Sequence, residues 1–430
     1  MTRLIDHGPR ITRGWVLHPD LKSDRDRRDG QRALDEAVAL AHALPGFEVH
    51  GADVVPLAKP QPGYLFGSGK IAELKEKFTE AEVELVLVDG TLTPVQQRNL
   101  EKEWKVKILD RTGLILDIFA DRARTREGVL QVDLAALSYQ RSRLVRSWTH
   151  LERQRGGLGF VGGPGETQIE ADRRAIDEQM TRLRRQLDKV VRTRDLHRAA
   201  RAKVPYPIIA LVGYTNAGKS TLFNRLTGAE VLAKDMLFAT LDPTMRQVKL
   251  PVGRDVILSD TVGFISDLPT ELVAAFRATL EEVLSAHIIV HVRDISHPET
   301  EQQKRDVETI LESLGTSDEV PRFELWNKID LLPEDRREAA RVQAARSEGV
   351  FAVSALTGEG IDALLDAVAE QLGGALRRER LELPWTDGKR RAWLFAHDVV
   401  RAEERGDTGS LLEVEWTDAE SDRFHALPQG

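Results

Sequence analysis

Residues 213–220 have the types and the spacing of a loop that binds phosphate. They are Gly-Tyr-Thr-Asn-Ala-Gly-Lys-Ser and match the pattern G-x-x-x-x-G-K-[S/T]. An apolar run at 208–212 predicts a strand before this loop, and residues 221–226 predict a helix after it. Glycines at the two ends let the backbone wrap closely, so that amide hydrogens and the positive end of the helix converge on phosphate oxygens. The segment, called the P-loop below, predicts a nucleoside triphosphate site.

Two side chains of the P-loop have predicted chemical roles. Lys219 supplies a positive charge to the β and γ phosphates, and the Ser220 hydroxyl is a predicted Mg²⁺ ligand. The predicted phosphate-binding residues are Gly213, Tyr214, Thr215, Asn216, Ala217, Gly218, Lys219, Ser220 and Thr221.

A second motif, Asp-Thr-Val-Gly at 260–263, follows the strand predicted at 256–260. The end of a buried strand is where a further contact to the magnesium site is expected, which favours Asp260. Gly263 has no side chain to block a hydrogen bond from its own amide to the γ-phosphate. The motif is weak alone and gains weight from its place after the P-loop.

A third motif, Asn327-Lys328-Ile329-Asp330, follows the strand predicted at 323–327 and indicates guanine recognition. A carboxylate at Asp330 accepts hydrogen bonds from N1–H and the exocyclic amino group of guanine, which adenine does not present. A site built around such bonds rejects the analogue that lacks them by about 10⁴ to 10⁵. Ser354-Ala355 follows a further predicted strand at 350–354, and its backbone amides are expected to reach the guanine carbonyl. The motifs therefore predict GTP rather than ATP.

Composition restricts the remaining possibilities. The 430 residues include no cysteine, which excludes disulfides, thiolate metal sites and cysteine nucleophiles and fits a reducing cytosol. We expect a cytoplasmic protein, because no run approaches the ~20 apolar residues that span a bilayer and no signal peptide is recognisable. The net charge of −8 excludes a globally basic nucleic-acid binder, so any such contact requires a local basic patch.

Alternating strand and helix patterns predict an α/β fold with four parts. These are an N-terminal α/β domain (1–125), an antiparallel helical hairpin (126–203), a P-loop GTPase domain (204–373) and a small C-terminal α+β domain (374–430). The N-terminal part has predicted strands at 15–17, 47–55, 84–89 and 106–110, with helices at 34–44, 71–78 and 94–104, which favours a mostly parallel sheet. The tail has a predicted strand at 381–384, a helix at 388–396 and strands at 399–405 and 411–416.

The hairpin prediction depends on two apolar stripes with helical spacing. One runs from Leu130 to Trp148 and the other from Ile169 to Val190, with a glycine-rich loop at 153–166 between them. From 141 to 203 there are sixteen Lys or Arg against eight Asp or Glu. We interpret this charge as an arm that faces a polyanion; the alternative is a solvated helix pair whose outer face is rich in arginine.

The motifs along the first 370 residues resemble those of the HflX family, in the translation-factor class of P-loop GTPases. The most specific is Gly-Pro-Gly-Glu-Thr-Gln-Ile-Glu, which starts at Gly163. Others are Leu-Phe-Gly-Ser-Gly-Lys at 65–70, Phe-Ala-Thr-Leu-Asp-Pro-Thr at 238–244 and Asp-Thr-Val-Gly-Phe-Ile at 260–265. The tail beyond residue 373 carries the resemblance least.

This resemblance implies roles for several residues. Thr240 would be the switch I threonine that completes the Mg²⁺ shell with Ser220, and Gly263 would anchor switch II. The expected catalytic residues are then Lys219, Thr240, Gly263 and Asn216. The resemblance also implies a monomeric factor that binds the large (50S) ribosomal subunit, contacts ribosomal RNA through the hairpin and splits stalled or stressed ribosomes into subunits. The expected RNA contacts are Arg153 and Arg155.

One position departs from the Ras-like pattern. Phe264 stands where Ras-like enzymes place a glutamine that orients water, so we expect slow intrinsic hydrolysis, about 10⁻³ per second or less, until a partner completes the site. Related GTPases with asparagine at the position of Asn216 hold K⁺ near the phosphates. Whether Asn216 binds K⁺ or stabilises the loop stays open.

Two further functional hypotheses compete with this one. In the first, GTP licenses the capture of a protein partner and RNA has no role. In the second, ATP binds the N-terminal domain at Gly67-Ser68-Gly69-Lys70 and drives RNA remodelling. That segment lacks the first glycine and the hydroxyl residue of the full pattern, because Tyr64 and Ile71 stand there, and a turn that opens a helix is the alternative.

We predict that Asp330→Asn exchanges guanine preference for xanthine preference. The amide presents a donor where the carboxylate accepted, and xanthine has a carbonyl in place of the amino group of guanine. Competition binding with GTP and xanthosine triphosphate measures the exchange. Unchanged GTP affinity in the variant would contradict the assignment of Asp330.

Overall fold

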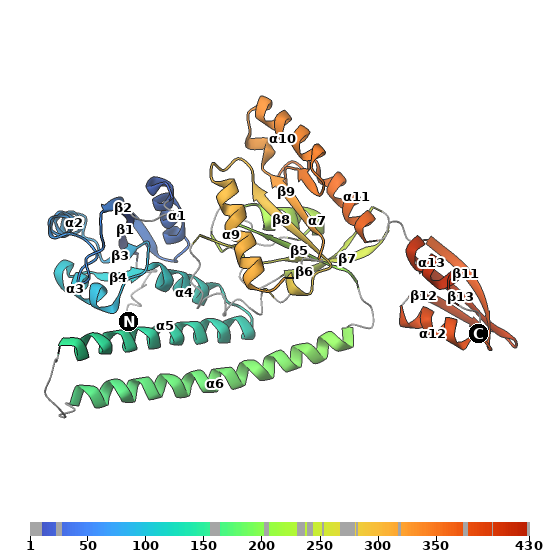
Figure 1. Ribbon diagram of the computed structural model, residues 1–430, viewed down its shortest axis with the longest axis horizontal. Helices are drawn as coiled ribbons and strands as arrows, with labels where there is room; N and C mark the ends of the chain where they lie inside the picture. The colour runs from blue at the N-terminus through green and yellow to red at the C-terminus, as the bar shows by residue number, and fades with distance from the viewer. Residues whose placement is uncertain are drawn as a thin grey trace, which may run out of the picture. The chain divides into compact units, whose positions relative to one another are not determined.

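The computed structural model describes residues 11–22, 28–154, 164–201, 206–229, 237–238, 244–251, 253–266, 280, 283–316, 320–372, 377–397 and 399–427. By internal contacts the chain divides into two compact units, each described by itself. The first contains residues 1–190 with 234–242 and 267–278, and the second contains 191–233, 243–266 and 279–430. Figure 1 labels the elements of both. The boundaries expected at 125, 203 and 373 stay predictions.

A four-stranded parallel sheet in the order β2-β1-β3-β4 forms the centre of the first unit, which confirms the predicted parallel sheet. Its strands are β1 (Thr12–Leu21), β2 (Phe47–Leu57), β3 (Leu85–Val88) and β4 (Lys107–Asp110). Helices α2 (Ser68–Glu80) and α3 (Pro94–Trp104) pack on one face, around Leu74, Phe78 and Leu100. Helices α1 (Gly30–His42) and α4 (Arg111–Arg122) contact each other and contribute no residue to that core.

Helix α4 has no counterpart among the predicted elements. No turn residue separates it from β4, so the local pattern carries no boundary signal. Asp110 ends the strand and also caps the helix, because its carboxylate accepts a hydrogen bond from the N–H of Gly113 at 2.9 Å. Helix α3, by contrast, has a clear start signal. Thr93 and Gln96 form a capping box with Pro94 as the first helical residue, and the predicted range 94–104 is confirmed.

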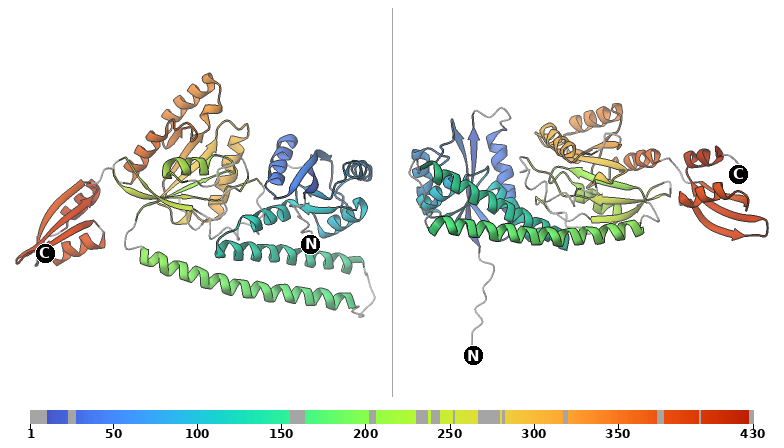
Figure 2. Two further views of the ribbon diagram at one scale, coloured as in Figure 1. Left: turned by 180° about the vertical axis from the view of Figure 1, so that it is seen from behind. Right: turned by 60° about the horizontal axis from the view of Figure 1, so that its bottom comes forward.

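Two long helices, α5 (Arg126–Gln154) and α6 (Pro164–Arg201), form the predicted antiparallel hairpin and lie side by side in Figure 1 and Figure 2. Leu130, Leu137 and Met180 are buried as the apolar stripes predict. The glycine-rich residues 155–163 lie outside the described part of the chain. The predicted loop end at residue 166 is corrected, because α6 begins at Pro164, where a proline loses no helical hydrogen bond.

Asp110 also fastens the hairpin to the sheet. Its fully buried carboxylate accepts from the Tyr139 hydroxyl at 2.6 Å and from Nη1 of Arg143 at 2.8 Å, both on α5. Arg143 also donates to Gln97 on α3. Burial and the Asp110 charge raise the pKa of the Tyr139 phenol. The phenol therefore keeps its proton and donates a hydrogen bond to the carboxylate. One buried acceptor therefore connects β4, α4 and α5.

The second unit contains a six-stranded sheet in the order β10-β9-β8-β5-β7-β6, and β6 runs antiparallel to β7. The strands are β5 (Ile208–Gly213), β6 (Thr244–Lys249), β7 (Asp255–Asp260), β8 (Ile288–Asp294), β9 (Arg322–Asn327) and β10 (Val350–Ala352). Strand β6 is not among the predicted elements. It is an edge strand of mostly polar residues, of which only Val248 is buried, so it has no apolar run to indicate a strand.

Helices cover both faces of this sheet. On one face α7 (Lys219–Thr227) and α11 (Ile361–Gln371) pack against a core that includes Leu222, Phe223 and Leu325. The next residue along β9, Trp326, faces the opposite side and packs against α10 (Glu334–Arg346). The helix α9 (Thr300–Ser313) buries Val307 and Leu311. The arrangement is the doubly wound α/β fold that the motifs predict.

The C-terminal residues form a three-stranded antiparallel sheet in the order β11-β13-β12, with two helices. The elements are β11 (Arg377–Pro384), α12 (Gly388–Ala396), β12 (Val400–Arg405), β13 (Gly409–Trp416) and α13 (Asp418–His425). The predicted strand, helix, strand and strand are confirmed. Helix α13 is missing from the prediction although Thr417 and Glu420 form a capping box before it. No helix in the described part of the chain is long and apolar enough to cross a membrane.

We predict that Asp110→Ala lowers the free energy of unfolding of the first unit by about 3 kcal/mol, because Arg143 and Tyr139 lose their buried acceptor. The matched control is Arg141→Ala, which removes only the half-exposed ion pair with Asp177 and costs about 1 kcal/mol or less. Urea denaturation followed by tryptophan fluorescence measures both variants. Equal losses would contradict the role given to Asp110.

Candidate nucleotide-binding site

The parallel strands bring the three motifs to one edge of the sheet. The P-loop leaves the carboxyl end of β5, Asp260 ends β7 and Asn327 ends β9. Because the carboxyl ends of parallel strands lie on the same side, residues far apart in the sequence converge there. The structure thus brings together the predicted phosphate and guanine residues that it describes.

The P-loop backbone depends on unusual dihedral angles. Gly218 has φ of +96°, and a side chain there would collide with the Asn327 amide. Asn216 has φ of +58°, a left-handed conformation that asparagine tolerates better than most residues. Asn216 is exposed, so this conformation supports a role in shaping the loop and leaves the K⁺ interpretation open.

Lys219 is buried with its ammonium held by the loop itself. Its Nζ donates to the carbonyl oxygens of Gly213 at 3.1 Å and Tyr214 at 2.8 Å. Burial lowers the pKa of Lys219 to about 8, and the Asp260 carboxylate opposes that effect. A phosphate anion bound in the loop would favour the charged form further, as the predicted role of Lys219 requires.

The residues that follow the second motif are attached to the P-loop by hydrogen bonds. The N–H of Thr215 donates to the Phe264 carbonyl at 2.6 Å, and the N–H of Phe264 donates to the Gly213 carbonyl at 3.1 Å. The Tyr214 hydroxyl accepts from the N–H of Ser266 at 2.6 Å. A Cβ on Gly263 would lie 2.8 Å from the Thr215 Cα, so the close approach requires glycine. The predicted start of switch II, at Gly263, thus contacts the P-loop.

The ring of Phe264 is 1% exposed. A buried apolar ring neither donates to nor accepts from an attacking water. The geometry therefore agrees with the premise of the predicted slow hydrolysis, and the rate itself stays a prediction.

The residues predicted for a magnesium site fit a hard cation. The Ser220 hydroxyl lies 2.7 Å from Oδ2 of Asp260, and the Asp260 side chain is buried. A hydroxyl oxygen and a carboxylate oxygen are the donor types that Mg²⁺ prefers. No group of three or more His, Cys, Asp or Glu side chains able to hold a metal occurs among the described residues. Thr240, the other predicted ligand, lies outside them.

On the base side, Asn327 joins two loops. Its Nδ2 donates to the Ala217 carbonyl of the P-loop at 2.8 Å, and its Oδ1 accepts from the N–H of Ala355 at 2.9 Å. Lys328 has φ of +66° and its ammonium pairs with Asp294 at 2.8 Å. Asp330 lies in the short 3-10 turn η1 (Ile329–Leu331) and is partly exposed, as a side chain that contacts a ligand must be.

The two amides predicted to reach the guanine carbonyl already have acceptors. The N–H of Ser354 donates to the Glu359 carbonyl at 3.0 Å, and that of Ala355 donates to Asn327. A guanine carbonyl would therefore share these donors rather than meet free ones. Sequence patterns carry no signal for this pairing, because it depends on the tertiary contact between β9 and the loop after β10.

The remaining predicted residues belong to the first unit or lie outside the described residues. The side chain of Arg153 and all of Arg155 are outside the described residues. At the start of α2, Lys70 pairs with Glu73 at 2.7 Å, which favours a turn that opens a helix. Phe238, two residues before Thr240, packs its ring against Phe119 of α4 at 4.7 Å within the first unit.

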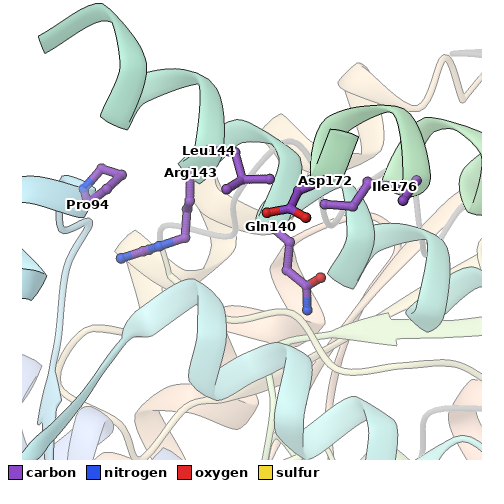
Figure 3. Close-up of a pocket in the computed structure, with 7 residues that line it drawn as sticks. Pro94, Gln140, Arg143, Leu144, Asp172 and Ile176 are labelled. Carbon is purple, nitrogen blue, oxygen red and sulfur yellow. The ribbon is translucent and has the colours of Figure 1, made fainter. Parts of the chain in front are cut away.

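A hollow of about 560 Å³ lies along the hairpin in the first unit. Figure 3 shows Gln140 and Arg143 on α5 and Asp172 and Ile176 on α6 around it, with Pro94 at the start of α3. It has no glycine loop and no ring of amides for phosphate. We assign it no ligand.

The doubly wound fold, the P-loop, the carboxylate at the end of β7 and the Asn-Lys-x-Asp turn define the class of P-loop GTPases, enzymes that bind and hydrolyse GTP. Four family models match the chain: "GTP-binding GTPase N-terminal" at 31–120, "GTP-binding GTPase Middle Region" at 122–201, "50S ribosome-binding GTPase" at 208–328 and "HflX C-terminal domain" at 339–426.

Relatives match over nearly the whole length. A GTPase HflX of Magnetococcus marinus is 52% identical, covering 90% of this chain and 88% of that protein. The GTPase HflX of Escherichia coli is 44% identical over 92% and 91%. A crystal structure of a GTP-binding protein from Sulfolobus solfataricus with GDP is 22% identical, with a TM-score of 0.46, over 84% of this chain and 98% of that one. The chain belongs to the HflX family of GTPases.

Proposed function

We propose that this GTPase, in its GTP state, binds the large ribosomal subunit and splits stalled or stressed ribosomes into subunits. The observation that supports this most is the match of residues 208–328 to the family described as "50S ribosome-binding GTPase". The basic hairpin supports it independently, because a local excess of Lys and Arg in a chain of net charge −8 is the pattern expected for contact with ribosomal RNA.

The exposed side of α6 carries the charge available for such contact. Its exposed arginines include Arg173, Arg174, Arg182, Arg184 and Arg185. Arg174 and Arg182 also pair within the helix, with Glu170 and Glu178, so the helix is both solvated and basic. The Asp110 contacts attach α5 firmly to the sheet, which would let the hairpin act as a stiff arm with Arg153 and Arg155 near its tip.

The nucleotide chemistry would be carried by residues of the second unit and by Thr240. The P-loop amides and Lys219 would bind the β and γ phosphates, the Gly263 amide would bind the γ-phosphate, and Asp330 would recognise guanine. Mg²⁺ bound by Ser220 and Thr240, with Asp260 beside it, would neutralise phosphate charge. K⁺ held by Asn216 would add a positive charge where other GTPases use an arginine finger. Phe264 leaves the attacking water without a side-chain partner, so the ribosome would complete the site.

The finer parts of the proposal follow from this scheme. The protein would act as a monomer in the cytoplasm and hydrolyse GTP slowly until it meets a large subunit. The competing function is a GTP-dependent switch that captures a protein partner. ATP binding at Gly67–Lys70 is the weaker addition, because the Lys70 ammonium pairs with Glu73 and the segment departs from the full P-loop pattern at Tyr64 and Ile71.

We predict that purified large subunits stimulate GTP turnover by at least tenfold, with binding that weakens as salt rises, and that K⁺ gives faster turnover than Na⁺. Deleting residues 156–163 should remove ribosome splitting and leave basal turnover within twofold, because these residues belong to the predicted glycine-rich loop and to none of the nucleotide motifs. Steady-state phosphate release and sedimentation of ribosomes measure the two activities.

The control is a change between two other elements: replacement of the three residues 317–319, between α9 and β9, by Gly-Ser-Gly. It should change neither activity. A GTP turnover rate that is the same with and without large subunits would favour capture of a protein partner. Equal loss of both activities in the deletion variant would mean that the loop supports folding.

A further inference from the structure

The loop after β10 supplies Ser354 and Ala355 to the guanine side of the site. We call residues 353–360 the guanine loop. It folds on itself, because the N–H of Gly358 donates to the Ser354 carbonyl at 2.8 Å and the N–H of Ser354 donates to the Glu359 carbonyl at 3.0 Å. Gly358 and Gly360 have φ of +95° and +76°. Val353 and Ala355 are buried in the core of the second unit, whereas Leu356 is 70% exposed. The position of the exposed part of the loop, which begins at Leu356, therefore depends on hydrogen bonds from neighbouring elements.

Arg225 holds this loop from the helix that begins at the phosphates. It lies on α7, six residues after Lys219. Its Nε donates to the Ala355 carbonyl at 2.7 Å, and its Nη2 donates to the Leu356 carbonyl. A guanidinium can aim two donors at two neighbouring carbonyls in fixed geometry, which a lysine cannot do.

The loop backbone is shaped to receive this guanidinium. A Cβ on Gly358 would lie 2.7 Å from Nη1 of Arg225, so the absence of a side chain there leaves space for the contact. The left-handed φ of Gly358 adds a second reason for glycine at this place.

Side chains from β9 and α10 hold other parts of the same loop. Asn327 accepts from the Ala355 N–H at 2.9 Å, and the Glu359 carboxylate pairs with Nε of Arg341 at 2.8 Å and with Arg337, both on α10. Helix α10 therefore holds the loop at Glu359, and β9 holds it at Ala355. Arg225 provides the contact to α7, the helix whose first residues are predicted to bind phosphate.

We propose that Arg225 is a positioning residue that fixes the guanine loop against α7 and thereby sets how long a guanine nucleotide stays bound. The proposal rests on the base site proposed above. Without Arg225 the carbonyls of Ala355 and Leu356 lose two donors and the loop must be ordered again at each binding event. The base contacts then weaken while the P-loop stays intact.

A purely structural role is the competing explanation. Arg225 lies in the last turn of α7, where a positive charge is favourable at the negative end of the helix. That role would require only a charge, and its loss would disturb α7 and the phosphate contacts together. The two explanations therefore differ in whether base binding and phosphate binding change together.

The test uses the full chain with Arg225→Gln. We expect a ribose-labelled fluorescent GDP to dissociate about tenfold faster, since two hydrogen bonds of partly exposed groups are lost. Competition by inorganic tripolyphosphate, which has no base, should stay within twofold of wild type. Single-turnover hydrolysis of bound GTP should also stay within twofold.

Arg225→Lys should restore little of the GDP residence time, and Gly358→Ala, which displaces the guanidinium, should accelerate release like Arg225→Gln.

The matched control is Arg305→Gln, which changes an exposed arginine on α9 that donates to Gln302, and it should leave GDP release unchanged. Equal weakening of GDP and tripolyphosphate, full rescue by lysine, or an unchanged release rate would overturn the proposal. If the wild-type protein binds GDP no better than ADP, the base site itself is wrong; if it prefers GDP and Arg225→Gln releases GDP normally, only the role of Arg225 is wrong.

Discussion

The carboxamide of Asn327 makes one site out of two loops. It is 1% exposed, donates to the Ala217 carbonyl of the P-loop at 2.8 Å and accepts from the Ala355 N–H of the guanine loop at 2.9 Å. A buried amide that loses either partner pays the full cost of an unsatisfied polar group. The distance between the P-loop and the guanine loop is thereby fixed, so that a nucleotide bound at the proposed site would contact both.

The other features of the second unit support this bridge. Gly218 is required because a side chain would collide with the Asn327 amide, and Arg225 holds the same guanine loop from α7. The first unit uses a similar device, since the buried carboxylate of Asp110 connects β4, α4 and α5 through several donors. In both units a single buried polar group, fully hydrogen-bonded, orders elements that are distant in sequence.

The sequence predicts the parts whose signals are local. The P-loop strand and helix, the helix after Thr93 and the hairpin stripes were all recognisable from spacing and capping residues, and each is confirmed. Strand β6 and helix α4 escape prediction, since one is a polar edge strand and the other follows its strand without a turn. The partners of the Ser354 and Ala355 amides and the contacts of Arg225 arise only from tertiary packing, which one sequence does not encode in any local pattern.

Titration calorimetry of GDP and ADP against the wild-type chain and Asn327→Ala tests the bridge most directly, with Asn99→Ala as the matched control because its amide also donates to a backbone carbonyl. We expect the wild type and Asn99→Ala to bind GDP at least 10⁴-fold more tightly than ADP. Asn327→Ala should lose at least tenfold in GDP affinity, about 1.4 kcal/mol. Equal affinities for GDP and ADP in the wild type, or an unchanged GDP affinity in Asn327→Ala, would contradict it.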